Sequence, residues 1–236
     1  MSIWTNIGAF ASRIEVPSLQ AIVDALKRVF VADPELRRQV AFSVAMIALS
    51  AKMAKADGVV TDSEVGAFRE IFHIPPDEER NVARLYNLAR QDIAGFEAYA
   101  GQMARLCGSG ARNCMLLEDI LDGLFHIAKS DGLIHEHELD YLQRVAGIFE
   151  IDGSHFEQIL ARHARQGEGD PFLVLGVSHD ASRAQIVSRY RQLAAENHPD
   201  RLIGRGFPAE FIRIANDRMA AINAAYAAIE AGWKFL

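Results

Sequence analysis

Apolar residues along this chain recur at intervals of three and four residues, which is the spacing of one helix face. The clearest examples are Ile71, Val82, Leu85, Leu88, Ala89, Leu116, Ile120, Leu124 and Ile127. Alternating runs of β-branched residues bounded by turn residues, which are typical of strands, do not recur. The pattern therefore predicts an all-α protein built from amphipathic helices.

A polar stretch divides the chain at residues 164–169. Two glycines fall within three residues there and a proline follows, a composition typical of linkers. The charge balance also changes, because residues 1–168 hold 17 basic and 24 acidic side chains whereas residues 169–236 hold 8 and 7. The expected units are an amphipathic helical segment at 1–30, a helical domain at 31–163 and a second domain at 170–236.

The first domain repeats a short pattern at an offset of 74 residues. Residues 54–65 read AKADGVVTDSEV and residues 128–139 read AKSDGLIHEHEL, and both lie between apolar helical patterns. Each copy is predicted to be a helix–turn–helix, and one amphipathic hairpin cannot bury its apolar face alone. We therefore expect a helical bundle in which two hairpins pack about a pseudo-twofold axis.

The repeat also places acidic residues at matching positions in its two turns. They are Asp57, Glu64, Asp131 and Glu138. Carboxylates from two facing turns supply the hard oxygen ligands that calcium and magnesium prefer, although the longer loop of an EF-hand is not matched. Gly58 and Gly132 can instead end a helix in the left-handed conformation, and Thr61 with Glu64 fits a capping box. The pattern favours turn-and-cap architecture and leaves a divalent-cation site open.

Alternating histidines and glutamates at residues 135–138 invite a zinc interpretation. Zinc enzymes with helical ligands place two histidines four residues apart, whereas His135 and His137 are two residues apart and point apart on a helix. The sequence also lacks a Gly-rich phosphate loop and a G-x-S-x-G nucleophile elbow. The pattern is typical of a solvated turn, and no catalytic residue is predicted.

Composition limits the partners and compartments that suit the chain. Its 236 residues carry a formal net charge of −6, which argues against a general binder of nucleic-acid backbones. The cysteines Cys107 and Cys114 lie seven residues apart, and we expect them to share a helix face without bridging. No positively charged segment opens the chain as in a signal peptide, so a reducing cytoplasm is expected.

Two apolar stretches bear on membrane contact. Residues 40–51 form the most apolar run, but a transmembrane helix needs about 20 such residues, so a buried core helix is expected. Near the N-terminus, Ile3, Trp4, Ile7 and Phe10 could form one apolar helix face. That face packs on the neighbouring domain in the favoured interpretation and lies on a membrane surface in the other.

The second domain contains a helix that a proline stops between two polar residues. A capping box at Ser182 opens this helix, and its core stripe runs to Asn197. Pro199 disfavours helical geometry in the residue before it, so the helix should end near residue 198. A second helix is predicted from about residue 208 to residue 232, which makes an antiparallel hairpin. The residues expected at its exposed tip are His198, Pro199 and Asp200.

These surroundings resemble a DnaJ-type J-domain over residues 169–236. The resemblance rests on the opening DPF, the turn LGV, the segment ENHPDR and the ending INAAYAAI. The preceding domain, with its KADG and KSDG turns, resembles TerB-like domains, and the order of the two resembles the DjlA-like co-chaperones. The implied fold is a TerB-like helical bundle followed by a J-domain helical hairpin.

The resemblance implies a regulator that does no chemistry itself. J-domains bind the ATP form of a DnaK-type heat-shock chaperone and accelerate its ATP hydrolysis. By the match, His198, Pro199 and Asp200 would carry that signal, and the Asp200 carboxylate could pair with a partner arginine. The basic residues that would steer docking onto an acidic surface are Arg183, Arg189, Arg191 and Arg201.

Several departures from the family pattern limit which properties of J-domain proteins can be expected of this chain. Val187, Ser188, Gln192 and Glu196 occupy positions that are often basic in J-domains, which implies a modest or partner-selective affinity. The Gly/Phe-rich linker, Cys-rich zinc region and β-rich client domain of full DnaJ proteins have no counterpart here, so a general client-holding chaperone is not expected. DjlA-like proteins often carry an N-terminal membrane span, which this sequence does not show.

The favoured hypothesis is a cytoplasmic co-chaperone of a DnaK-type chaperone. Its TerB-like domain would act as a targeting module or would bind client proteins or an ion, and it could form a homodimer. The alternative is a divalent-metal or stress-responsive binding module centred on the TerB-like domain, with the J-domain secondary. Neither hypothesis includes nucleic acid or a transmembrane segment as a partner or anchor.

Overall fold

The computed structural model describes residues 34–57, 74–92, 95–105, 114–164, 169–198, 200 and 211–233. In residues 34–42, 55–57 and 211 the backbone alone is described. Within these ranges the chain forms helices and no strand, which confirms the all-α prediction. The segment expected at residues 1–30, with its apolar face, lies outside the described residues.

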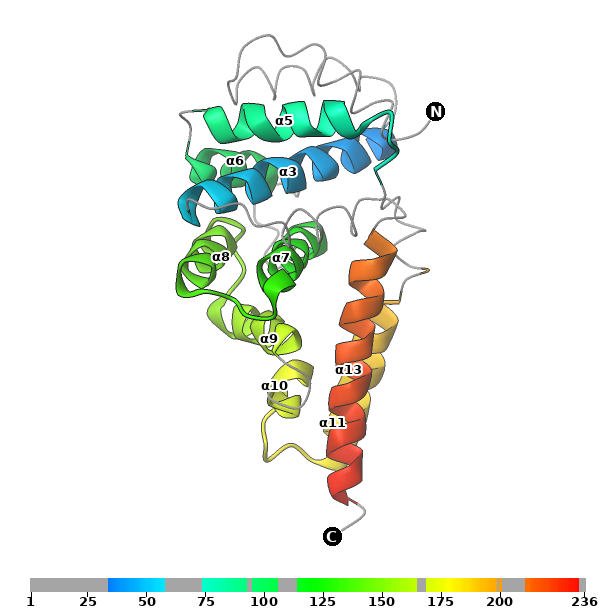
Figure 1. The fold of residues 1–236 in the computed structure, drawn as a ribbon. Coiled ribbons are helices and arrows are strands. Elements are labelled where there is room, and N and C mark those ends of the chain that lie inside the picture. The colour runs from blue at the N-terminus through cyan, green and yellow to red at the C-terminus, as the bar shows by residue number, and fades with distance from the viewer. Residues whose placement is uncertain are drawn as a thin grey trace.

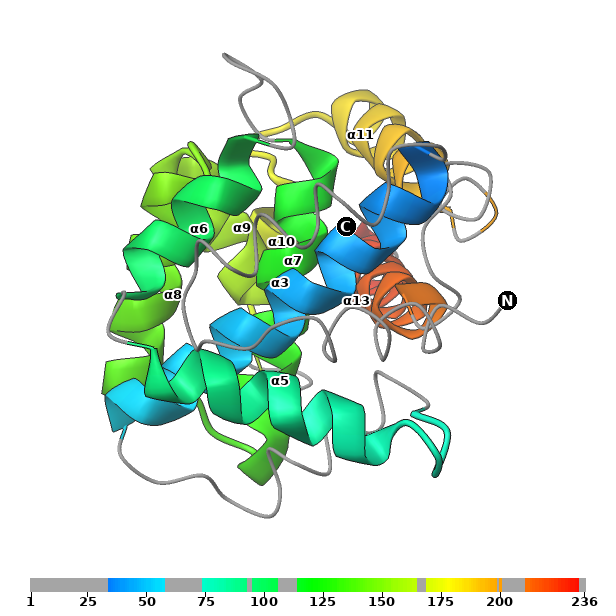
Figure 2. The ribbon, with the colours of Figure 1, turned by 90° about the horizontal axis from the view of Figure 1, so that it is seen from above.

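The first domain is built from helices in two layers. They are α3 (Pro34–Asp57), α5 (Glu79–Gln91), α6 (Phe96–Ala104), α7 (Met115–Ala128), the 3-10 turn η2 (Lys129–Asp131), α8 (Glu136–Ile148) and α9 (Gly153–His163). Figure 1 shows α5, α6 and α3 above α7, α8 and α9, and Figure 2 shows α3 crossing the bundle. α3 contacts α5, α6, α7 and α8, so it lies at the centre of the domain.

The middle of α3 is buried on every side, because helices from both layers cover it. All side chains from Ser43 to Ala54 are buried. Fully burying a side chain such as Met46 or Leu49 contributes about 1.5–3 kcal/mol. The Ser50 hydroxyl donates to the Met46 carbonyl at 2.7 Å, which satisfies a polar group in this apolar setting. The run predicted as a buried core helix is confirmed, and no helix among the described residues is long and apolar enough to span a membrane.

The second copy of the repeat is a helix–turn–helix, as predicted. α7 ends at Ala128, η2 follows, and Gly132 takes the left-handed conformation with φ 95° before α8 begins at Glu136. In the first copy α3 ends at Asp57, and residues 58–65 lie outside the described residues. The pseudo-twofold axis therefore stays a prediction.

The second domain contains α10 (Pro171–Leu175), α11 (Arg183–Glu196) and α13 (Phe211–Trp233). The backbone amide of Gln185 donates to the Ser182 hydroxyl oxygen at 3.4 Å, and the backbone amide of Ser182 donates to the Gln185 side-chain oxygen at 2.8 Å. These two bonds confirm the predicted capping box. α11 and α13 pack side by side, with buried Leu193 and Ile222 in their shared core. α11 ends at Glu196, close to the predicted end near residue 198.

The two domains pack directly against each other at two places. α10 lies on α9, where the Gln158 side-chain amide donates to the Val174 carbonyl at 3.0 Å. The first half of α13 lies on α7 and α9, and Ile214 joins the core of the first domain (Figure 1). The sequence analysis expected a linker at residues 164–169, of which 165–168 lie outside the described residues. On either side of it, the domains share a buried interface that the sequence analysis did not foresee.

Cys114 corrects one expectation from composition. This residue, directly before α7, is disulfide-bonded, and no cysteine among the described residues is free. Cys107, the other cysteine of the sequence, lies outside the described residues. The expectation that Cys114 forms no disulfide bond is wrong, and cysteine usage no longer favours a reducing compartment.

Candidate partner-binding site

The predicted partner-binding bend begins where α11 ends. Asn197 is the C-cap residue, and both its backbone amide and its side-chain amide donate to the Leu193 carbonyl, at 2.9 and 2.8 Å. Beyond it, the side chains of His198 and Asp200 are 57% and 85% exposed. Pro199 lies outside the described residues. The end of α11 therefore presents an imidazole and a carboxylate to solvent.

The two exposed side chains of the bend are linked to each other. The Asp200 amide donates to His198 Nδ1 at 3.3 Å, and the Asp200 carboxylate oxygen Oδ2 lies 3.6 Å from the same nitrogen. Because Nδ1 accepts the hydrogen bond from the Asp200 backbone amide, a neutral imidazole carries its proton on Nε2. His198 thus offers an N–H donor, and Asp200 offers an acceptor carboxylate, to an incoming partner.

The predicted arginines divide into different environments. Arg183 and Arg191 are exposed and flank a shallow hollow of about 580 Å³ that Val187 and Ser188 also line. Arg189 is half-buried, and its Nε donates to the Leu175 carbonyl at 3.2 Å within the second domain. Arg201 lies outside the described residues. The structure therefore brings Arg183 and Arg191 together on one surface and directs Arg189 inward.

A buried cluster of charged residues lies where α13 meets the first domain, and the sequence analysis missed it. Its members are Glu118, Asp119 and Asp122 of α7, His155, Arg162 and His163 of α9, and Arg218 of α13, together called the junction cluster. Arg218 is its centre, with a side chain only 2% exposed. Its Nε donates to Asp122 Oδ2 at 2.7 Å and its Nη2 donates to Asp119 Oδ1 at 2.5 Å.

α9 supplies the remaining partners of these carboxylates. Arg162 Nη2 donates to Glu118 Oε1 at 2.9 Å, and His163 Nε2 lies 2.7 Å from Asp122 Oδ1. His155 Nε2 lies 3.0 Å from Glu118 Oε2. Three carboxylates thus face two guanidinium groups, so the cluster has one excess negative charge when its histidines are neutral.

This charge balance separates the pKa values of the three carboxyl groups. Burial opposes ionisation of Glu118, but His155 and Arg162 outweigh it and lower its pKa to about 2. Burial likewise opposes ionisation of Asp122, and Arg218 with the other basic partners holds its pKa well below the usual range. Burial raises the pKa of Asp119 to about 6 against the attraction of Arg218. The Asp119 Oδ2 atom is buried without a hydrogen-bond partner among the described residues, and a negative charge on it would be poorly stabilised. This agrees with the raised pKa of Asp119.

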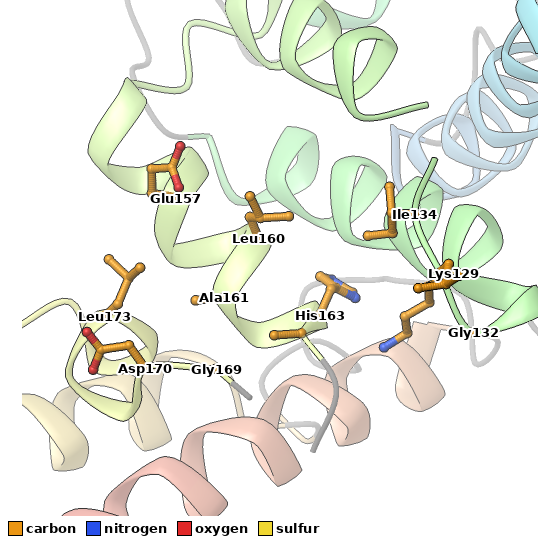
Figure 3. Close-up of a pocket in the computed structure, with 12 residues that line it drawn as sticks. Lys129, Gly132, Ile134, Glu157, Leu160, Ala161, His163, Gly169, Asp170 and Leu173 are labelled. Atoms are coloured by element: carbon orange, nitrogen blue, oxygen red, sulfur yellow. The ribbon is translucent and has the colours of Figure 1, made fainter. Parts of the chain in front are cut away.

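An open hollow of about 360 Å³ lies beside the junction cluster, between α9, the turn after α7 and α10 (Figure 3). Figure 3 shows Lys129 and His163 at one end of it, and Glu157 and Asp170 toward the other. Its lining includes Leu133 and Leu173, which are 54% and 37% exposed. Both are large apolar side chains, so the hollow gathers apolar surface that water contacts.

The predicted metal ligands are placed in different ways. Asp131 is exposed, and its carboxylate accepts the Leu133 amide at 3.0 Å and lies 3.0 Å from His135 Nε2. Glu138 is buried and accepts the His135 amide at 2.9 Å, as the glutamate of a capping box does. Among the described residues no three His, Cys, Asp or Glu side chains gather as a metal site would require. For Asp57 the backbone alone is described and Glu64 lies outside, so the cation site stays a prediction.

The sequence did hold a signal for the junction cluster. Arg218 falls four residues after Ile214 and four before Ile222, on the apolar stripe of its helix. A charged residue on a core stripe indicates a buried ionic partner. In α7, the acidic residues Glu118, Asp119 and Asp122 stand within a largely apolar run. These anomalies indicate buried charges that need partners, but the sequence alone does not say which residues pair.

Comparison with known proteins adds the family. Residues 43–161, about half of the chain, match the family described as tellurite resistance protein TerB. The chain belongs to the TerB family. Residues 170–231 match the DnaJ domain, so the two regions are a TerB domain and a J-domain, in that order. No solved structure matches the chain significantly.

Curated relatives carry one name. The co-chaperone protein DjlA of Legionella pneumophila is 27% identical, over 83% of this chain and 78% of its own length. DjlA of Photobacterium profundum is also 27% identical, over 84% and 80%. DjlA of Photorhabdus laumondii is 32% identical over 56% of this chain and 57% of its own length. With these relatives and with a TerB domain followed by a J-domain, the chain is a J-domain co-chaperone, a regulator of a DnaK-type partner.

These relatives correct the expected localisation. The chain groups with co-chaperones named DjlA, a group for which the resemblance implies an N-terminal membrane span in many members. The cytoplasmic assignment rested on cysteine usage and on the lack of a recognised signal or span, and neither ground holds. Cys114 is disulfide-bonded, and the finding that no helix could span a membrane concerns the described residues alone. The cytoplasmic assignment is therefore wrong.

Proposed function

We propose that this co-chaperone uses the His198–Asp200 bend to trigger ATP hydrolysis by a DnaK-type chaperone. The observation that supports it is the exposed pair of His198 and Asp200 at the end of a capped helix, inside the region that matches the DnaJ domain. The chain itself would transfer no group and bind no nucleotide. It would act by contact with the ATP-bound partner.

Each part of the α11 surface has a separate task in this proposal. Asp200 offers an exposed carboxylate to a partner arginine, a charge-assisted contact that can be bidentate. His198 contributes its Nε2 proton as a donor beside it. Arg183 and Arg191 lie on the same helix and steer its approach to an acidic surface. Arg191 precedes His198 by seven residues, or about 10 Å along a helix.

The test is single-turnover ATP hydrolysis by the cognate DnaK, with the full chain added as wild type or as His198→Gln. Glutamine keeps polarity but cannot reproduce the imidazole that holds Asp200, so acceleration should be lost. His179→Gln is the matched control, because His179 is an exposed J-domain histidine 3.0 Å from the Asp170 carboxylate and far along the chain from the bend. A folded wild type that leaves the hydrolysis rate unchanged would overturn the proposal.

For the TerB domain we propose a targeting role through contact with client proteins. The hollow that Leu133 of the TerB domain shares with Leu173 of the J-domain helix α10 supports this, because exposed apolar surface gathered in one place is typical of binding sites. Replacing Leu133 and Leu173 with serine should weaken client capture without changing ATPase stimulation. Equal capture by wild type and variant would remove this role. Homodimerisation through this domain stays a prediction.

A further inference from the structure

A single guanidinium joins the TerB domain to the partner-binding bend. Arg218 reaches Asp119 and Asp122 of the TerB domain with its Nε and Nη2 atoms. Its third nitrogen, Nη1, donates to the Asn197 side-chain oxygen at 2.9 Å. Asn197 directly precedes His198 in the chain. The path from the TerB core to the bend therefore contains two side chains and three hydrogen bonds.

Asn197 caps the end of α11 and is held from two sides. Its side-chain amide donates to the Leu193 carbonyl while its side-chain oxygen accepts from Arg218. It is 6% exposed, so neither contact competes with bulk water. The direction in which His198 and Asp200 leave the helix depends on the backbone of this residue. An arginine that fixes the Asn197 side chain therefore also fixes the start of the bend.

The TerB side of the link is rigid as well. Asp122 is held by His163 and Arg162 of α9 in addition to Arg218. The planar guanidinium of Arg218 requires its acceptors at defined angles, which a flexible ammonium group would not. The J-domain core lies on the other side, where α13 packs against α10 and α11. Arg218 therefore lies between the packed TerB domain and the packed core of the J-domain.

We propose that Arg218 is a positioning residue for the His198–Asp200 bend, held from the TerB domain by Asp119 and Asp122. The TerB domain then sets how strongly the J-domain stimulates its partner, in addition to any targeting role. This inference rests on the proposed function, because its effect is measured as ATPase stimulation.

The proposal separates two quantities in a titration of the partner. Docking through Arg183 and Arg191 governs the concentration for half-maximal stimulation, since these residues lie on the outer surface of α11. Orientation of the bend governs the plateau, because a misplaced trigger contact lowers the rate of every docked complex. A variant that is only partly folded behaves differently, because less of the added protein is active. Its apparent half-maximal concentration would rise, while its plateau would stay at the wild-type value.

Asn197→Ala in the full chain is the primary test, with single-turnover ATP hydrolysis titrated to saturation. The plateau should fall about tenfold while the half-maximal concentration of folded protein stays constant. Asn223→Ala is the matched control, because Asn223 accepts a hydrogen bond from the Tyr190 hydroxyl at 3.1 Å inside the J-domain hairpin. That variant loses an exposed side-chain hydrogen bond of the same hairpin without touching the link, and it should keep the wild-type plateau.

Two further variants separate the interdomain link from the local capping bond. Asn197→Asp keeps an acceptor for Arg218 and loses the donor to Leu193, so it should retain most of the plateau. Asp119→Asn changes the TerB domain alone and keeps the shape of the side chain, and it should lower the plateau about threefold. Thermal unfolding monitors the folded fraction of each variant.

The outcomes distinguish this inference from the proposed function. A wild type that does not accelerate hydrolysis overturns the proposed function itself. A wild type that accelerates hydrolysis, with Asn197→Ala and Asp119→Asn both at its plateau, overturns the positioning role alone. An Asn197→Asp variant as weak as Asn197→Ala overturns it too, because the bond to Leu193 would then carry the effect.

Discussion

The bend after α11 and the junction cluster are both polar, but they relate to solvent in opposite ways. At the bend, the Asp200 side chain is 85% exposed, and its carboxylate lies 3.6 Å from His198 Nδ1. In the cluster, Arg218 is 2% exposed and every charge lies within reach of an opposite one. An exposed ion pair contributes little to stability, whereas a buried charge that loses its partner is costly. The bend is therefore free to serve a partner, while the cluster serves the fold and the placement of the bend.

The largest effect on stability is expected from Arg218→Met, which removes the central charge of the buried junction cluster. Removing this guanidinium leaves Asp119 and Asp122 buried without it, and the free energy of unfolding should fall by about 3–5 kcal/mol. Asp200→Asn, at the exposed bend, should change it by less than about 0.5 kcal/mol. Urea unfolding of the two variants measures both values. Equal stability of the two would contradict the assignment of the cluster to the fold.

The next effect concerns pH. The pKa of Asp119 in the folded protein, about 6, lies above the roughly 3.9 of an unfolded aspartate. Between these two pH values, the native state keeps a proton on Asp119 that the unfolded state has released. This contribution to stability is fully present below the unfolded value and is lost as the pH rises through 6. Its size is about 2–3 kcal/mol, at 1.36 kcal/mol for each unit.

Asp119→Asn removes the contribution of Asp119 protonation to stability, because a side-chain amide does not titrate. Between pH 4 and pH 6.5 the free energy of unfolding of the wild type should fall relative to that of the variant. Urea unfolding at several pH values gives the two slopes. Parallel curves for wild type and variant would show that Asp119 ionises normally in the native state.

The smallest effect is expected at the second contact between the domains, which carries no charge. Gly176 has φ 64°, and a Cβ atom added there would lie 3.0 Å from the Gln158 side chain of α9. Gly176→Ala should therefore cost about 1 kcal/mol from the left-handed backbone, with some displacement of Gln158. Thermal unfolding measures the cost. Gly232→Ala is the control, since a Cβ there meets nothing within 4 Å.

The difference between the two regions also explains what could be predicted from the sequence. The helix that leads to the bend follows from neighbours in sequence: Ser182 opens it, Asn197 continues its core stripe, and a proline at 199 disfavours its continuation. The junction cluster depends on contacts between residues 96 and 99 positions apart, which no local pattern encodes. The link from Arg218 to Asn197 lies beyond local patterns for the same reason, because it joins residues 21 positions apart.

Other features fell between these cases. The turn after α7 was predicted from Gly132, whose left-handed backbone the structure confirms. The acidic residues of that turn suggested a metal, and the structure shows Asp131 and Glu138 accepting backbone amides, while the cation site itself stays a prediction. The inward position of Arg189 could not be predicted, because the carbonyl that it binds belongs to α10.

One titration tests the central claim most directly: single-turnover ATP hydrolysis by the cognate DnaK against increasing wild type, His198→Gln and Asn197→Ala. The account predicts acceleration by the wild type and none by His198→Gln. For Asn197→Ala it predicts a lowered plateau at an unchanged half-maximal concentration. A folded wild type that leaves the rate of hydrolysis unchanged, or a folded His198→Gln variant that matches the wild type, would contradict it.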